Sequence, residues 1–180
     1  APIRPMVGVI GVAPAGGPVL TGTPGEHGGN LDCKEITAGA TVYLPVFAEG
    51  ALLALGDIHA LMGDGEVCIC GAEVSGEITL RTRLLRGTLP TPAVETESAV
   101  WFLGSALTLD ECERIVLDKA HAWLTGVLGL GANEAARFMS LLGDLQVCQV
   151  VDPLKTMRFG FRKERLRPLG LGAGLAERLA

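Results

Sequence analysis

The sequence has few aromatic residues, no excess of positive charge and no long uninterrupted apolar run. Aromatic residues make up 4% of the 180 residues, and the formal net charge is −5. A negative chain has no general attraction to nucleic acid or acidic lipid. The best apolar stretch, residues 40–56, contains Pro45 and Glu49 and is too short to span a bilayer. The first four residues, Ala1-Pro-Ile-Arg4, do not show the basic-then-apolar pattern of a signal peptide.

The cysteines do not have the spacing of a disulfide framework or a zinc site. They are odd in number and scattered, at positions 33, 68, 70, 112 and 148. Cys68 and Cys70 would share one face of a strand, but no second close pair completes a zinc-type spacing. We therefore expect reduced, mostly buried thiols. Reduced thiols are typical of the cytoplasm, and we expect a cytoplasmic protein.

Glycine, proline and apolar residues are abundant instead. The chain has 25 glycines and 10 prolines, and 48% of its residues are hydrophobic. This composition provides enough apolar surface for a core, with frequent turns between short elements, and it favours a mainly β fold over a helical bundle. A chain of this length fits one compact domain or two small ones.

Hydrophobic patterning divides the chain into a β-rich first part and a mixed second part. Strands are predicted at residues 7–12, 41–47, 77–84, 99–107, 145–151 and 157–162, and helices near residues 109–125 and 133–142. Thr108 and Glu111 form a capping box before the first helix, and Asn133 would cap the second. We expect a β-rich, site-bearing segment at 1–107 and an α/β segment at 108–180, packed together as one structural unit.

A basic cluster follows the second helix. Because the overall charge is negative, we interpret it as a solvated face or a subunit contact. Its members are Lys155, Arg158, Arg162, Lys163, Arg165 and Arg167.

The polar chemistry is concentrated between Asn30 and Glu73. Four ionisable residues flanked by glycine or other small residues lie within ten positions there: Asp57, His59, Asp64 and Glu66. On an extended segment, the i, i+2 spacing of Asp57 and His59 would point both side chains the same way. A carboxylate beside an imidazole suits a divalent metal site. It equally suits a general-base pair, in which the carboxylate fixes the tautomer of the imidazole.

The spacing also permits a structural interpretation. Gly-Asp and Asp-Gly are ordinary turn sequences, and a histidine near an aspartate is often only a hydrogen-bonded structural residue. His27, in the glycine-rich loop at residues 16–30, could line a site or lie in solvent. His121, on the first predicted helix, favours a structural role.

An ordered series of motifs resembles the acetamidase/formamidase family. The matching stretches are Val7-Gly-Val-Ile-Gly-Val-Ala-Pro14, Gly28-Gly-Asn-Leu-Asp32, Tyr43-Leu-Pro-Val46, Gly56-Asp-Ile-His-Ala60, Gly63-Asp-Gly-Glu-Val67, Met139-Ser-Leu-Leu142, Leu145-Gln-Val147 and Val150-Val-Asp-Pro153. Glu73 follows Glu66 at the spacing of the family. The ordered series is specific, whereas any single motif would be weak.

The resemblance implies hydrolysis of a short-chain amide such as formamide or acetamide to a carboxylate and ammonia. It also implies a homo-oligomer, and a β-sandwich-like fold with an appended α/β part. A divalent metal, zinc in the first place, is expected. By the same resemblance, the metal ligands would be Asp32, Asp57 and His59, the catalytic residues Glu66, His59, Asp57 and Glu73, and the substrate-binding residues Asn30, Gly29 and Met62.

Family members also carry a β-rich portion before the segment that matches Pro2–Pro14. We therefore expect the fold to be incomplete at its amino terminus, with a companion chain as one source of the rest. The alternative to an amidase is a non-catalytic structural or assembly subunit, or a truncated paralogue, that keeps these motifs as turns. We expect no nucleic acid and no membrane among the partners.

Overall fold

A computed structural model of the chain describes residues 1–167, 170, 174 and 175, and most of the regular structure in this part is sheet. The strands are β1 (Met6–Gly11), β2 (Gly28–Asn30), β3 (Thr41–Tyr43), β4 (Ala54–His59), β5 (Ala93–Glu95), β6 (Ala99–Ala106), β7 (Gly143–Gln149) and β8 (Lys155–Arg162). The helices are α1 (Leu109–Ala122), its π-helical continuation η1 (Trp123–Val127), α2 (Ala132–Leu142) and α3 (Lys163–Leu166). The mainly β character agrees with the prediction.

The strands form two antiparallel sheets. One has three strands in the order β2-β1-β4, and the other has five in the order β3-β5-β6-β8-β7. The larger sheet takes β3, β5 and β6 from residues 1–107 and β7 and β8 from the segment predicted at 108–180. The two predicted segments therefore contribute strands to one sheet. The end of the second segment lies outside the described residues.

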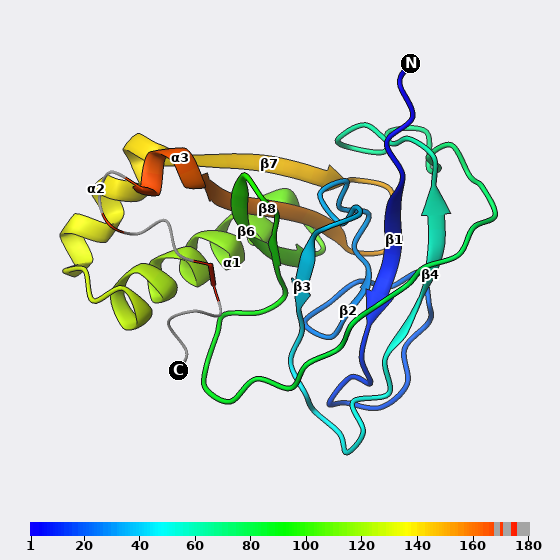
Figure 1. The fold of residues 1–180 in the computed structure, drawn as a ribbon, viewed down its shortest axis with the longest axis horizontal. Coiled ribbons are helices and arrows are strands. Elements are labelled where there is room, and N and C mark those ends of the chain that lie inside the picture. Colours follow the sequence, from blue (N-terminus) through cyan, green and yellow to red (C-terminus); the bar gives the residue numbers. More distant parts are fainter. Residues whose placement is uncertain (168–169, 171–173, 176–180) are drawn as a thin grey trace.

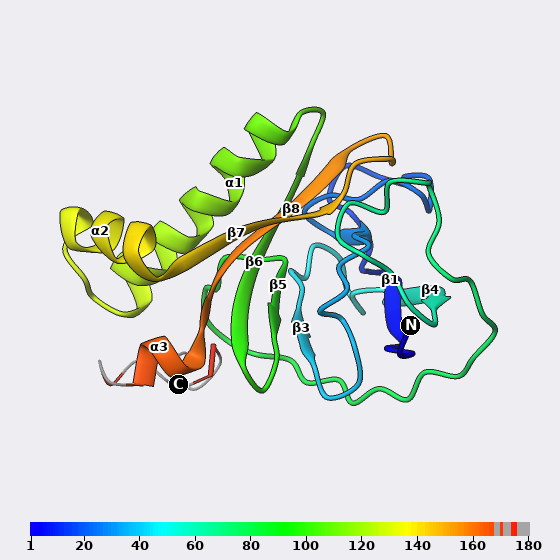
Figure 2. The same ribbon diagram turned by 90° about the horizontal axis from the view of Figure 1, so that it is seen from above.

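The five-stranded sheet lies between the helices and the three-stranded sheet (Figures 1 and 2). On its helical face, Phe102 of β6 and Phe161 of β8 pack with Trp123, and the ring centroids of Phe102 and Trp123 are 5.6 Å apart. On its other face, Trp101 of β6 packs with Ile10 and other residues of the first part of the chain. This alternation along β6 follows from the period of two in a strand, and it produces two separate apolar cores.

The predicted helices are confirmed, and one predicted cap is wrong. Thr108 Oγ1 accepts the Glu111 N–H at 3.2 Å, and Glu111 Oε2 accepts the Thr108 N–H at 3.1 Å, which is the predicted capping box. Helix α2 begins earlier than predicted. Its N-cap is Gly131, whose N–H donates to Glu134 Oε2 at 3.4 Å, and Asn133 lies inside the helix.

The strand predicted at residues 77–84 is wrong. No strand covers this range, and Leu84 is 77% exposed. Shortly before residue 77, the chain runs beside β4, and there the Val74 N–H donates to the Ile58 carbonyl at 3.0 Å. Alternation of apolar and polar residues shows that a segment could lie on a half-buried sheet, but a strand also needs a neighbour for its backbone groups. Among the described residues, no strand pairs with residues 77–84.

The cysteines and the helices bear on the expectations of reduced thiols and of no membrane-spanning segment. All five cysteines are free, and three of them, Cys33, Cys112 and Cys148, are buried. No helix in the described part of the chain has the length and apolarity needed to cross a bilayer.

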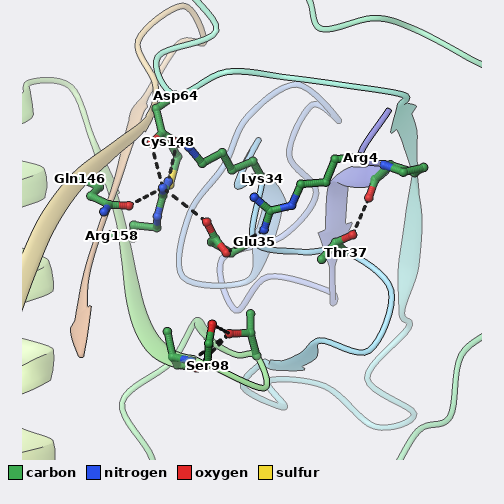
Figure 3. Close-up of polar contacts among 12 residues, drawn as sticks. Arg4, Lys34, Glu35, Thr37, Asp64, Ser98, Gln146, Cys148 and Arg158 are labelled. Carbon is green, nitrogen blue, oxygen red and sulfur yellow. Dashed lines mark hydrogen bonds and ion pairs between the residues drawn. The ribbon is translucent and has the colours of Figure 1, made fainter. Parts of the chain in front are cut away.

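Arg158 is buried in β8, which corrects its assignment to a solvated basic face. Its side chain has no exposed area. Nη1 and Nη2 each donate to one oxygen of Asp64 at 2.9 Å, and Nη2 also donates to Gln146 (Figure 3). The guanidinium lies 5.3 Å from the ring centroid of Trp101. These partners are far from Arg158 in sequence, so the basic cluster gave no sign of them.

Glu95, at the end of β5, fastens β3 and the last described residues to the larger sheet. Its carboxylate accepts hydrogen bonds from the Tyr43 hydroxyl at 2.8 Å, the Lys163 ammonium at 2.6 Å and the Leu175 N–H at 2.9 Å. Burial would by itself raise the pKa of Glu95, but these three donors hold it below its ordinary value of 4.5.

Replacement of this carboxylate should give a pH-dependent loss of stability. Glu95→Gln should lower the free energy of unfolding by about 1–3 kcal/mol at pH 7, because all three hydrogen bonds to the charged carboxylate are weakened or lost. Since the folded-state pKa is depressed, the contribution of the carboxylate is present above the unfolded pKa and is lost as pH falls through the folded one. Urea melts at pH 7 and pH 3.5 should therefore show a smaller difference at pH 3.5. The exposed Glu97→Gln is the control. An equal loss at both pH values would contradict this account.

Candidate functional site

Strand β4 brings together an aspartate and a histidine. His59 is its last residue and is 1% exposed. The Nε2 atom of His59 lies 3.3 Å from Asp57 Oδ1. The two side chains therefore meet, as their i, i+2 spacing predicts.

The loop that follows β4 brings two further carboxylates to the same imidazole. Glu73 Oε1 lies 2.9 Å from His59 Nε2, and Glu66 Oε1 lies 4.0 Å from it. Glu66 is buried, whereas the side chain of Glu73 is 51% exposed. Gly71 packs against the imidazole so closely that a Cβ there would be 2.7 Å from His59 Nδ1. The absence of a side chain at Gly71 thus lets the loop close over the histidine.

A third segment contributes Asp32, which follows β2 and is buried. Gly8 of β1 lies between Asp32 and Asp57, and a Cβ at Gly8 would overlap a carboxylate oxygen of each. A residue with any side chain at position 8 would therefore push the two carboxylates apart. This gives Gly8 a steric role that the sequence motif did not reveal.

Three of these carboxylate residues have a backbone conformation that L-residues rarely adopt. The φ angles are +42° at Asp32, +57° at Asp57 and +43° at Glu66, and they account for half of the six non-glycine residues with positive φ in the described chain. Aspartate is tolerated in this region, whereas glutamate is uncommon there. Such backbone strain costs on the order of 1–3 kcal/mol per residue and tends to occur at functional sites.

Burial and mutual repulsion keep protons on part of this cluster. Burial, with the charges of Glu66, Asp57 and Asp152, raises the pKa of Asp32 to about 8. Burial also raises the pKa of Glu66, although the neighbouring His59 opposes the change. Without a cation, Asp32 is therefore protonated at neutral pH and shares its proton with Glu66.

The donor set fits a divalent cation. Ligand atoms of Asp32, Asp57 and His59 all lie within 4.8 Å of one another, and so do those of His59, Glu66 and Glu73. Asp32 Oδ1 is buried and has no hydrogen-bond partner among the described residues. A cation would supply that partner and offset the crowded negative charge. Carboxylate oxygens with one imidazole suit zinc or manganese.

The other candidates from the sequence lie in different places. Gly29 and Asn30 belong to β2, and Met62 is buried in the loop after β4. Asp64 does not join the cluster, because it binds Arg158 and lies 2.8 Å from Lys34 Nζ.

The other two histidines are separate from the imidazole of the cluster. His27 is partly buried next to Gly29. His121 Nε2 lies 3.3 Å from the Ala132 carbonyl and so connects α1 to α2.

Asp152 is a carboxylate near the cluster that the sequence did not single out as a site residue. It lies in the turn between β7 and β8, and its charge raises the pKa of both Asp32 and Glu66. Asn30 Nδ2 donates to Asp152 Oδ2 at 2.9 Å. An aspartate before a proline is an ordinary turn signal, so its local sequence favoured a structural interpretation.

A solvent-open hollow of about 680 Å³ lies beside β4. Asp57 and Glu73 are the two cluster members that line it, together with Leu55, Gly56, Ile58, Val74, Ser75, Gly76 and Ile78. The cluster therefore reaches solvent through its two more exposed carboxylates, while Asp32, His59 and Glu66 are buried.

Comparison with known proteins identifies the family of the chain. A sequence profile for the Acetamidase/Formamidase family matches residues 12–108. A putative formamidase of Schizosaccharomyces pombe is 45% identical over 76 residues, covering 42% of this chain and 18% of that protein. An acetamidase of Mycolicibacterium smegmatis is 46% identical over 74 residues, covering 41% of this chain and 18% of that protein.

Solved structures show the same relationship over nearly the whole chain. An acetamidase from Bacillus halodurans matches with a TM-score of 0.85 and 45% identity, over 94% of this chain and 58% of that one. A predicted acetamidase/formamidase from Thermoanaerobacter tengcongensis matches with a TM-score of 0.84 and 44% identity, over 94% of this chain and 56% of that one. The chain thus spans a little over half the length of these structures. It belongs to the acetamidase/formamidase family.

The steric role of Gly8 leads to a test of the cation site. Gly8→Ala should weaken Zn²⁺ binding by at least about tenfold, because its methyl group separates the carboxylates of Asp32 and Asp57. Gly56→Ala is a matched control on the neighbouring strand, since a Cβ there meets no atom within 4 Å. Isothermal titration with Zn²⁺ measures both affinities. Equal affinities in the two variants would contradict the assignment of Asp32 and Asp57 as ligands.

Proposed function

We propose that this centre hydrolyses a short-chain amide of the formamide or acetamide kind to a carboxylate and ammonia. The observation that supports this most is the buried imidazole of His59 with three carboxylates, those of Asp57, Glu66 and Glu73, within 4.0 Å of its Nε2. Family membership supplies the class of reaction.

The reaction requires groups that this cluster can provide. A water oxygen forms the new C–O bond, the C–N bond breaks, and the nitrogen leaves as ammonia with a proton that came from the water. In the metal-free form of the mechanism, His59 Nε2 accepts the proton of the water, and Asp57, 3.3 Å from the same atom, stabilises the imidazolium that forms. Glu66, 4.0 Å from His59 Nε2, is placed to pass the proton taken from the water to the leaving nitrogen. Glu73, at the solvent side, exchanges protons with the bulk.

The same residues would hold a divalent metal, and zinc is the first candidate. Asp32, Asp57 and His59 are the proposed ligands, and the buried unpaired oxygen of Asp32 supports this choice. A bound cation would polarise the amide carbonyl and make water more acidic. The alternative is that Asp57 and His59 act as a general-base pair without metal.

Substrate would enter through the hollow beside β4. Asn30, Gly29 and Met62 are the proposed substrate-binding residues. Gly28 and Gly29 have φ angles of +92° and +86°, which favour glycine, and close packing of neighbouring atoms around both residues fixes the position of Asn30. An extra methylene changes affinity by only about 1–3 kcal/mol in an accommodating site, so acyl-chain preference is a matter for measurement.

We further propose that the two sheets and the helical layer form the β-sandwich-like core and α/β part of the family fold. The proposed working enzyme is a cytoplasmic homo-oligomer that acts on a small amide and binds neither nucleic acid nor membrane. The solved relatives are longer than this chain, which covers 58% of one and 56% of another. We propose that a β-rich portion corresponding to their remainder, on this chain or on a companion chain, is required for activity.

The alternative function is a structural or assembly subunit without catalysis. The limited coverage of the relatives favours it, since part of a working site could lie in the uncovered portion. Ammonia release distinguishes the two, because a scaffold releases none from formamide or acetamide even when the companion portion is present.

Removal of the central imidazole should abolish the activity. His59→Ala should lower kcat/KM for acetamide by at least about 10²-fold, since no other imidazole lies among these carboxylates in the described chain. His121→Ala, on the surface of α1, is the control and should retain activity. Ammonia release is measured on the assembled enzyme, with circular dichroism to confirm folding. Similar activity in the two variants would remove His59 from the mechanism.

Chelation separates the metal mechanism from the general-base pair. If a cation is required, exhaustive dialysis against a chelator should abolish ammonia release, and Zn²⁺ should restore it. Metal content is measured by mass spectrometry before and after dialysis. Full activity with no detectable metal would be consistent with the proposed amidase activity and would exclude a cation from the mechanism.

A further inference from the structure

Asn30 and Asp152 form a polar pair across the two sheets, and the proposed mechanism gives no role to Asp152 and no defined contact to Asn30. Asn30 ends β2 of the three-stranded sheet, and Asp152 lies in the turn between β7 and β8 of the other. Asn30 Nδ2 donates to Asp152 Oδ2 at 2.9 Å. The two residues are 122 positions apart, so the pair exists only in the folded chain.

The turn that carries Asp152 is held by a buried glutamine. Gln149 Oε1 accepts the backbone N–H groups of Val151 at 2.9 Å and Asp152 at 3.0 Å. The Nε2 atom of Gln149 donates to the Leu154 carbonyl at 2.7 Å and to Thr156 Oγ1 at 3.0 Å. The Asp152 carboxylate is therefore a fixed acceptor rather than a mobile surface group.

A fixed acceptor on one side of Asn30 determines which way its carboxamide points. Because Nδ2 faces Asp152, Oδ1 must face away from it. This Oδ1 atom is buried and has no hydrogen-bond partner among the described residues. A buried unpaired acceptor is rare in native proteins and costs about 1–3 kcal/mol.

The neighbouring side chains cannot readily satisfy this oxygen. Asp152 is one of the charges that raise the pKa of Asp32 and Glu66, so the ionisable groups near the pair are carboxyls, and the proton of Asp32 is engaged by Glu66. Burial and the charge of Asp57 raise the pKa of Asp152, so Asp57 is a further carboxylate in this region. The missing donor is best supplied by a ligand that carries an N–H group.

We infer that Asn30, oriented by Asp152, accepts a hydrogen bond from the N–H of the substrate carboxamide and so selects primary amides. This inference rests on the proposed amidase function and gives a reason for its substrate class. A primary amide has two N–H donors on its nitrogen, whereas an ester or a carboxylate of the same shape has none. A site that hydrogen-bonds a substrate N–H discriminates strongly against an analogue without it, because the acceptor is then left buried and unpaired. Asn30 is thus a specificity-determining residue and Asp152 its positioning residue.

The test compares acetamide with two ligands of the same acyl group that have no N–H. For the assembled wild-type enzyme, Asn30→Ala and Asp152→Asn, kcat/KM is measured for acetamide and methyl acetate, together with the inhibition constant of acetate. Asn30→Ala should lower kcat/KM for acetamide about 10²-fold, and Asp152→Asn about tenfold. Turnover of methyl acetate should change less than about threefold, and acetate should inhibit no more weakly than before. The matched controls are Asn133→Ala and Asp118→Asn, both at exposed positions of the helices.

The outcomes separate the two proposals. If the wild-type enzyme hydrolyses acetamide and the Asn30→Ala variant does so equally well, the role of Asn30 is overturned. A parallel loss for acetamide, for methyl acetate and for acetate inhibition would also overturn it, because that pattern is the result of structural damage. If the assembled wild-type enzyme releases no ammonia from any short amide, the proposed function fails first, and this inference fails with it.

Discussion

The arrangement of the site depends on the buried guanidinium of Arg158. Its bidentate contact with Asp64 joins the loop after β4 to the five-stranded sheet (Figure 3). The backbone strengthens the same junction, since the Gly65 N–H donates to the Cys148 carbonyl at 2.9 Å and the Gly65 carbonyl accepts from Val150 at 3.1 Å. Because the guanidinium is fully buried, loss of Asp64 would leave a buried charge without its bidentate partner, so the loop is strongly held. Glu66 and Asp152 lie within two residues of this junction, which fixes both of them relative to His59.

Several unfavourable features coexist at the centre that this junction holds together. Burial and repulsion raise the pKa of Asp32 to about 8, and three of the carboxylate residues have positive φ angles. The two apolar cores on either side of the five-stranded sheet offset such costs. Asp64 is the opposite case. Although it is partly buried, its hydrogen bonds to Arg158 and Lys34 hold its pKa below the ordinary value. Asp64 thus stabilises the fold, whereas Asp57 and Glu66, its neighbours in sequence, are available for chemistry.

The sequence predicted the local features of this structure better than the long-range ones. The capping box at Thr108 depends on near neighbours and occurs as predicted, and the alternation of Trp101 and Phe102 follows from the strand predicted at 99–107. Asp57 and His59 were found because i, i+2 spacing brings side chains together in a strand. Arg158 and Asp152 were missed because their roles depend on partners about 90 to 120 residues away. The strand predicted at 77–84 failed because alternation does not show whether a neighbouring strand is present.

The central claim is that the Arg158–Asp64 junction places the carboxylates around His59 for catalysis. The most direct measurement is kcat/KM for acetamide in Asp64→Asn, with folding checked by circular dichroism. Asparagine keeps the size of the side chain but removes the charge of the bidentate partner, and Glu35 Oε1 remains 3.8 Å from Arg158 Nη2. Asp144→Asn, at the more exposed ion pair with Arg165, is the control. The account predicts that folded Asp64→Asn loses at least about tenfold in kcat/KM, while Asp144→Asn loses almost nothing. A folded Asp64→Asn enzyme with the kcat/KM of the wild type would contradict it.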